Sequence, residues 1–162
     1  MTPTMITLEE LAWLYRCQRR VWLDAHADPA GRVALTRDAI ARRVANHAHA
    51  TRIVAATGGA AVPDGPWEQR IAATAELARS GAPLLAWGAL ECQSGATMIH
   101  GAPTLLRRTG DADAPDGWSY QAIVVRLHSE ATRWDRAYID ALRWLAGTAL
   151  ADGRVADGEL WL

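Results

Sequence analysis

The segment YQAIVVRLHS, residues 120–129, combines the apolar run of a buried strand with two side chains that can do chemistry. Side chains alternate along a strand, so Val124, Arg126 and His128 share one face. A histidine can move protons near neutral pH, and an arginine can hold a carboxylate, a phosphate or a developing oxyanion. The pair therefore indicates acid–base chemistry on an anionic ligand.

Further candidates lie on two other segments of the chain. Alternation in TMIHGAPTLL places His100, Ala102 and Thr104 on one face of a strand. His47 lies in ANHAHA, within a helical segment, and His49 falls on another face of that helix. These residues add neutral and proton-transferring groups to the candidates from the strand.

Each candidate also has a purely structural interpretation. A buried Arg126 requires an anionic partner, and Glu91 or Glu130 could supply one within the protein. A helix histidine is often an ordinary helix residue, and a histidine at a strand end is often a rim residue. A zinc site made of histidines is a further possibility, but the spacing offers no compact pair such as i, i+4 on a helix, so we predict no metal.

The tryptophans divide into core and cleft candidates. Trp87 lies in an expected strand and Trp118 lies beside an aspartate-rich loop, so both could line a cleft. The others considered occupy apolar positions of expected helices and are predicted to be core residues: Trp13, Trp22, Trp134 and Trp144.

The helices and strands that position these residues can be predicted from the spacing of apolar residues and from the signals at helix ends. Thr7 and Glu10 form a capping box before a helix from Leu8 to about residue 26, with a break near Cys17. Further helices are expected over 36–57, 67–81 and 129–150. Residues 83–92 and 97–108 are predicted to form a hairpin, followed by strands at 120–127 and 158–162.

This order of elements predicts an α/β domain with a mixed central sheet flanked by helices. The 162 residues suffice for one domain spanning 1–162, and no internal repeat or linker interrupts them. Asp111, Asp113 and Asp116 belong to a polar loop and are expected to be solvated surface rather than metal ligands.

Composition narrows the class of partner. The formal net charge is -1, so no overall basic field favours nucleic acid. All 17 basic residues are arginine, a bias typical of a GC-rich genome. No apolar run approaches the ~18 residues that a membrane span needs, and two cysteines are too few for a metal framework. We expect a cytoplasmic protein with no membrane partner.

The segment LYRCQRRVWLDAHADP, together with the order of elements, resembles the RecB-like branch of the PD-(D/E)XK nuclease superfamily. It is most similar to the CRISPR-associated RecB-type exonucleases and their bacterial relatives. The resemblance covers nearly the whole chain, and RCQRRVWLD is its most specific part. It implies a PD-(D/E)XK fold, in which carboxylates hold a divalent metal that activates water for phosphodiester hydrolysis.

Positions that carry the family's catalytic residues hold other residue types in this chain. The resemblance places Ala48 at the glutamate of a His-Glu pair, and Thr104 at a metal-binding aspartate. It places Val124 and Arg126 at an acid and a lysine, and it aligns Tyr138 with a tyrosine of the following helix. No acid lies between residues 120 and 128, and the chain has no lysine, so the nuclease chemistry is predicted to be lost.

The family geometry also implies what occupies the former metal cleft. His47 comes from the helix that covers the cleft, and the strand faces bring in the remaining candidates: His100, Arg126 and His128. Cys17 matches a position used by iron–sulfur members, but the later cysteines of such a cluster are absent. We therefore predict a degenerate site without metal or cofactor.

Two functional hypotheses follow. In the first, the cleft is a pocket for an organic metabolite and supports metal-free isomerase, lyase or cyclase chemistry. His47, Arg126 and His128 would be catalytic, and the ligand would be bound by the remaining candidates: His100, Thr104, Trp87, Trp118 and Tyr138.

In the second hypothesis, the chain is a non-catalytic pseudo-nuclease that binds DNA or a partner protein. A rim of arginines would contact phosphates: Arg16, Arg19, Arg20, Arg42, Arg43, Arg107 and Arg108. A solvated face is the simpler interpretation of these arginines, because 18 acidic residues are interspersed with them. The sequence leaves the oligomeric state open.

Overall fold

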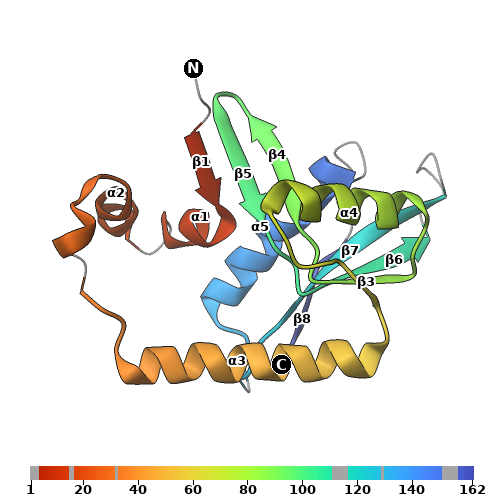
Figure 1. Ribbon diagram of the computed structural model, residues 1–162, viewed down its shortest axis with the longest axis horizontal. Coiled ribbons are helices and arrows are strands. Elements are labelled where there is room, and N and C mark those ends of the chain that lie inside the picture. The colour runs from red at the N-terminus through yellow and green to blue at the C-terminus, as the bar shows by residue number, and fades with distance from the viewer. Residues whose placement is uncertain (1–3, 15–16, 32, 111–116, 129, 151–156) are drawn as a thin grey trace.

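The computed structural model describes residues 4–14, 17–31, 33–110, 117–128, 130–150 and 157–162. The helices are α1 (Leu8–Leu14), α2 (Gln18–His26), α3 (Arg37–Thr57), α4 (Trp67–Arg79) and α5 (Arg133–Leu150), with a short 3-10 turn at Pro29–Gly31. The strands are β1 (Thr4–Thr7), β2 (Ala60–Ala61), β3 (Leu84–Ala86), β4 (Leu90–Ser94), β5 (Thr97–Gly101), β6 (Leu105–Gly110), β7 (Trp118–Val125) and β8 (Glu159–Trp161). The protein is mixed α/β, as the sequence predicts (Figure 1).

The larger sheet has five strands in the order β2-β3-β6-β7-β8. Strands β3, β6 and β7 pair antiparallel, whereas β8 pairs parallel with β7 after the chain has crossed over through α5. Arg126 follows the last residue of β7, and its backbone N–H donates to the carbonyl of Trp161 at 2.9 Å. This bond holds the end of β7 against the C-terminal strand.

A second sheet, which the sequence did not predict, contains three strands in the order β1-β5-β4. The expected hairpin exists as β4 and β5, but each of its predicted strands is divided in two. Trp87 interrupts the first with a φ of 59°, and Pro103, which has no N–H to donate, interrupts the second. The larger sheet is the mixed central sheet that the sequence predicts, whereas the prediction that each strand of the hairpin runs unbroken is wrong.

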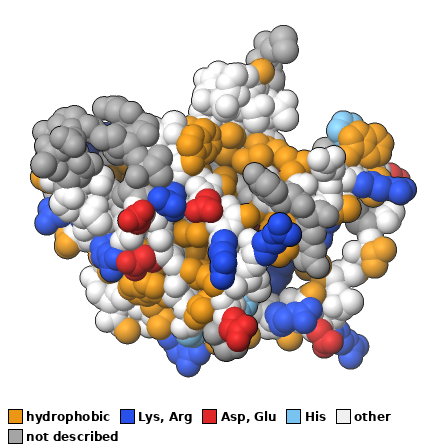
Figure 2. Space-filling model, turned by 180° about the vertical axis from the view of Figure 1, so that it is seen from behind, with side chains coloured by type: hydrophobic (Ala, Val, Ile, Leu, Met, Phe, Trp, Pro, Cys, Tyr) orange, Lys and Arg blue, Asp and Glu red, His pale blue; other side chains and the backbone are white. Residues whose placement is uncertain are grey.

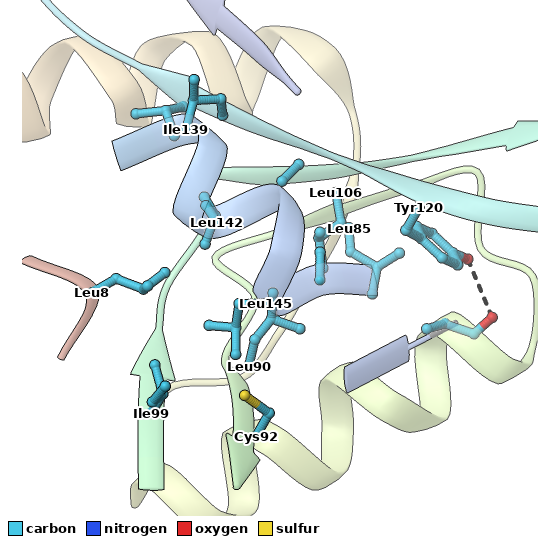
Figure 3. Close-up of a cluster of buried hydrophobic side chains, with 14 residues drawn as sticks. Leu8, Leu85, Leu90, Cys92, Ile99, Leu106, Tyr120, Ile139, Leu142 and Leu145 are labelled. Atoms are coloured by element: carbon cyan, nitrogen blue, oxygen red, sulfur yellow. Dashed lines mark hydrogen bonds between the residues drawn. The ribbon is translucent and has the colours of Figure 1, made fainter. Parts of the chain in front are cut away.

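The main core lies between the two sheets and is built around α5 (Figure 3). Leu142 and Leu145 of α5 pack with Leu8 of α1 and with buried residues of β4, β5 and β7. Gly101 has no room for a side chain, because an added Cβ would lie 2.5 Å from both Leu145 Cδ2 and Leu8 Cδ1. This close approach fixes the end of β5 against the core.

Strand β7 separates this core from a smaller one on its other face. Ala122 and Val124 belong to the main core that contains the α5 residues, whereas Ile123 packs with Ala86 and Leu105 in a second cluster that Val54 of α3 covers. The alternation follows from the period of two along a strand. Helix α3 therefore contacts the opposite face of the larger sheet from α5.

Local end signals account for the helix boundaries. The hydroxyl of Thr7 accepts from the N–H of Glu10, whose carboxylate accepts from the N–H of Thr7, which confirms the predicted capping box. Helix α3 begins after Thr36, whose hydroxyl accepts from the N–H of Ala39, and it ends at Gly58 in the left-handed conformation.

Two tryptophan predictions are wrong. The side chains of Trp22 and Trp144 are exposed, with 59% and 41% of their surface accessible, although both occupy apolar helical positions. Trp22 stacks on His26 of its own helix instead of entering the core.

Among the described residues, no helix has both the length and the apolar character needed to cross a membrane.

Candidate functional site

A cavity of about 710 Å³ lies where α3, the β1–α1 junction and the ends of β3, β5 and β7 come together. Six of the eight predicted site residues line it: His47, Trp87, His100, Thr104, Arg126 and Tyr138. They come from six elements or their adjoining loops, so only the fold brings them together. A volume in this range suits a small organic ligand.

Arg126 is held from two sides. Its Nε lies 3.6 Å from Oδ1 of Asp135, and its guanidinium lies over the Tyr138 ring, 5.2 Å from the centroid. Both partners lie on α5, and neither Glu91 nor Glu130, which the sequence offered as ion-pair partners, occupies this position. Arg126 still lines the cavity, so the ion pair orients the guanidinium and leaves it accessible to a ligand.

Asp135 is a buried carboxylate, with 7% of its surface accessible, at the start of α5. The hydroxyl and the N–H of Thr132 both donate to Oδ2, and His128 Nε2 lies 3.3 Å from the same oxygen. Burial alone raises the pKa of Asp135, but the Thr132 hydrogen bonds and the nearby His128 and Arg126 together lower it below its ordinary value. Asp135 is therefore an ionised partner for Arg126 at neutral pH.

Tyr138 stays a neutral phenol. Burial raises its pKa above the ordinary value, a shift that the nearby Arg126 opposes and Glu9 reinforces. Tyr138 and Glu9 both line the cavity, so the wall beside Arg126 combines a phenol with one carboxylate. Arg43 of α3 adds a second guanidinium to the same lining.

His100 is also buried, with 8% of its surface accessible. The register of the hairpin places it opposite Glu91, and its Nε2 lies 2.7 Å from Glu91 Oε2. This close contact is not a well-formed hydrogen bond, because Nε2 lacks a partner in hydrogen-bond geometry. The imidazole ring stacks on Trp67 of α4 at 5.1 Å with 14° between the planes.

His47 and Trp87 form a second aromatic contact in the cavity lining, with ring centroids 5.4 Å apart. His47 is exposed on α3, whereas the backbone of Trp87 adopts the left-handed conformation that a bulky residue rarely takes. The Trp87 N–H donates to the carbonyl of Thr104, and Arg70 Nη2 donates to the carbonyl of Trp87, both at 2.9 Å. Strain retained by such contacts is typical of a functional site.

Thr104 is a buried residue of the cavity lining. Its hydroxyl accepts a hydrogen bond from the N–H of Val125 at 3.3 Å, which ties the start of β6 to the end of β7. Val125 also lines the cavity, whereas Val124 points into the main core. The prediction that the Val124 face of this strand points into the cleft is therefore wrong for Val124, although Arg126 does reach the cavity.

Two predicted site residues lie outside the lining of this cavity. His128 contacts Asp135 beside Arg126, on the side of α5. Trp118 begins β7, at the other end of the strand from Arg126, where the Arg108 guanidinium lies over its ring. The aspartates of the polar loop, Asp111, Asp113 and Asp116, lie outside the described residues.

Sequence reasoning did not place several residues at the site: Glu9, Arg43, Asn46, Trp67, Glu91 and Asp135. Of these, Arg43 was assigned to a phosphate-contacting rim and Glu91 was offered as a partner of Arg126 instead of His100. Two of them had a signal. Asp135 follows Thr132 by three positions, the spacing of a capping box, and Glu91 lies as far before the hairpin turn as His100 lies after it. The others come from α1, α3 and α4, whose packing has no local signature.

The donor set of the cavity differs from that of a hard-cation site. Glu9 is the single acid among the described residues that line it, and positions 104 and 124 carry threonine and valine. Within the described ranges, no group of three histidine, cysteine or acidic side chains is arranged to hold a metal ion. The residues present do not fit the magnesium site that the family resemblance implies.

Fold and site together define a mixed α/β domain with an open cavity that combines two guanidinium groups, two imidazoles and several aromatic rings. No protein-family model, curated protein or solved structure matches this chain.

Proposed function

We propose that this chain is a degenerate RecB-like domain whose former metal cleft binds a small organic anion and supports metal-free acid–base chemistry. One observation carries the proposal. Positions that the resemblance assigns to the nuclease site, namely His47, Thr104, Arg126 and Tyr138, line one cavity although they are far apart in the sequence. The order of the strands, with β8 added parallel to an antiparallel β3-β6-β7 set, supports the same relationship.

Arg126 is the anchor for the anionic group of the ligand. Asp135 and Tyr138 fix the guanidinium before a ligand arrives, so little side-chain freedom is lost on binding. A planar guanidinium can hold a carboxylate or a phosphate with two parallel hydrogen bonds. The same charge stabilises an oxyanion that develops during proton transfer.

The aromatic residues favour a ligand with a flat apolar part. Trp67, Trp87 and Tyr138 line the cavity together with the two arginines. Aromatic faces bury apolar area at little cost in side-chain freedom, while the polar groups fix the orientation of the ligand. The expected substrate is thus an aromatic or conjugated organic acid, and the expected reaction is an isomerisation, elimination or cyclisation.

Tryptophan fluorescence tests this proposal with benzoate as the probe, because two tryptophans line the cavity. We expect saturable quenching that weakens at least about tenfold in Arg126→Gln, the loss typical of a charged hydrogen bond. Arg126→Lys keeps the charge but lacks the planar fork and should be intermediate. Arg79→Gln, which removes an exposed charge from α4, is the matched control and should bind as the unaltered protein does.

Binding of DNA or a protein partner is the second candidate, and the exposed arginines of α3 favour it: Arg42, Arg43 and Arg52. Arg16 of the predicted rim lies outside the described residues. Two other members have partners within the protein, because Arg107 pairs with Glu159 and Arg108 donates to the carbonyl of Gly81. On the face shown in Figure 2, basic and acidic side chains lie interspersed among hydrophobic ones.

Fluorescence anisotropy of labelled DNA across a salt series distinguishes the two candidates. Binding that weakens steeply with salt and is lost in a variant with Arg42→Gln and Arg52→Gln would favour the second. Cleavage of the DNA in the presence of magnesium would contradict the loss of nuclease chemistry.

A further inference from the structure

Three histidines lie in or beside the cavity, and their surroundings differ. His47 is exposed and touches Trp87, and His128 contacts Asp135 outside the cavity lining. His100 is buried, lines the cavity and has a carboxylate on one side and an indole face on the other. A group that transfers protons must be held in one orientation, and only His100 combines that restraint with access to the cavity among the described histidines.

The contact with Glu91 fixes which ring nitrogen of His100 carries the proton. Nε2 and Oε2 are 2.7 Å apart, and at this distance the field of the carboxylate favours the positive end of an N–H bond over a lone pair on the nearer nitrogen. The proton is therefore on Nε2 in the neutral ring, even though the oxygen lies off the ideal hydrogen-bond direction. Stacking on Trp67 limits rotation of the ring away from this position.

The second ring nitrogen of His100 is left as a free base. Nδ1 makes no hydrogen bond to any described residue, and it is not among the fully buried nitrogens that lack a partner. Because the residue lines the cavity, Nδ1 is the nitrogen that a ligand can reach. A carboxylate behind one imidazole nitrogen holds the ring in one tautomer and one orientation, with the other nitrogen directed at the ligand.

We propose that His100 is the proton-transferring residue of this cavity and that Glu91 is its positioning residue. The inference rests on the proposed function, and it replaces His47 and His128 in the role that the sequence suggested for them. In the step, Nδ1 takes a proton from a carbon of the bound acid, and the electron pair of that C–H bond becomes an enolate whose charge faces guanidinium groups of the cavity. Return of the proton to another carbon completes an isomerisation that requires no oxidant and no further reactant.

Nuclear magnetic resonance of the ¹⁵N-labelled protein tests this directly, because the two nitrogens of a neutral imidazole have well-separated ¹⁵N shifts. At a pH where the histidines are neutral, we expect His100 to carry its proton on Nε2. Addition of benzoate should shift the Nδ1 resonance of His100, while His26, which stacks on Trp22 on α2, should not respond. A proton on Nδ1, or an unchanged Nδ1 resonance while benzoate binds, would overturn the inference.

Two variants distinguish a positioning role of Glu91 from a purely structural one. Glu91→Gln keeps the shape of the side chain but loses the charge, so the tautomer preference of His100 should weaken while benzoate still binds at Arg126. Glu76→Gln, an exposed change on α4, should leave the tautomer unchanged. An unchanged tautomer in Glu91→Gln would contradict the role of Glu91.

Failure of the inference and failure of the proposed function give different results. Absence of benzoate binding to the unaltered protein would contradict the proposed function, whatever the tautomer of His100. Benzoate binding that depends on Arg126, with a response at His47 instead of His100, would keep the proposed function and reject His100.

Discussion

The two faces of the larger sheet are covered by α3 and α5, helices of similar length that differ in how many side chains they bury. Helix α5 buries Ile139, Leu142, Leu145, Ala146 and Gly147 together with Asp135, whereas the 21-residue α3 buries only Ala50 among its described side chains. The α5 side is close-packed, and the α3 side leaves room for the cavity. The α5 face of the sheet therefore contributes most of the buried core, and the α3 face leaves the space for the site.

The largest expected effect is on the α5 side. Leu142→Ala should lower the free energy of unfolding by about 2–5 kcal/mol, because it leaves a void in a fully buried position. Val44→Ala on α3, where 63% of the side chain is accessible, should change it by less than about 0.5 kcal/mol. Urea denaturation measures both, and equal losses would refute the difference between the two faces.

Gly101 lies at the border of the two regions, since it lines the cavity while its missing side chain would enter the core. Gly101→Ala should cost about 1–3 kcal/mol through overpacking against Leu145 and Leu8. Gly110→Ala is the control, because nothing lies within 4 Å of a Cβ added there. If Gly101→Ala leaves the free energy of unfolding unchanged, the side chains of Leu145 and Leu8 can move to accept the added methyl group.

Asp135 of α5 pairs with Arg126 of the cavity lining, and its contribution to the free energy of unfolding should depend on pH. A carboxyl whose folded pKa is lowered contributes stability above its unfolded pKa of about 3.9, and that stability is lost as the pH falls through the folded value. Asp135→Asn should therefore cost about 2 kcal/mol at neutral pH. The difference from the unaltered protein should shrink in acid denaturation series below about pH 4.

Asp140→Asn serves as the control for this prediction, because that carboxylate is exposed and pairs with Arg143 at the surface. It should have little effect at any pH. A loss in Asp135→Asn that is equally large in acid would show that Asp135 acts through its shape rather than its charge.

The smallest effect on stability is expected from Trp87, on the cavity side. Trp87→Leu should weaken benzoate binding several-fold, the value of an aromatic contact, with little loss of stability. Trp118→Leu, at the far end of β7, should leave the affinity unchanged. Equal affinities for the two variants, measured by calorimetry, would remove Trp87 from the site.

The sequence predicts the elements well wherever the signal is local. Helix α3 lies within one residue of its expected bounds because Thr36 and Gly58 mark its ends. Alternation along one predicted strand placed His100 and Thr104 on a common side. Both line the cavity, but His100 does so from β5 and Thr104 from the loop before β6, so alternation along a single strand is not the reason. The prediction of the helix bounds needs only the neighbours of each residue.

Features that depend on packing could not be predicted. Nothing near Trp87 in the sequence announces its positive φ, which ends β3 and helps to divide the predicted sheet. Asp135 meets Arg126 only because α5 folds back over β7. Apolar spacing placed Trp22 in the core, but such spacing cannot tell whether a partner element lies opposite the helix.

A crystal structure with 4-bromobenzoate tests whether Arg126 anchors an organic anion in this cavity. Anomalous scattering from bromine locates the ring independently of the protein density. We expect the carboxylate at Arg126 and the ring beside Trp67 or Trp87. Bromine bound elsewhere, with no ligand at Arg126, would contradict it.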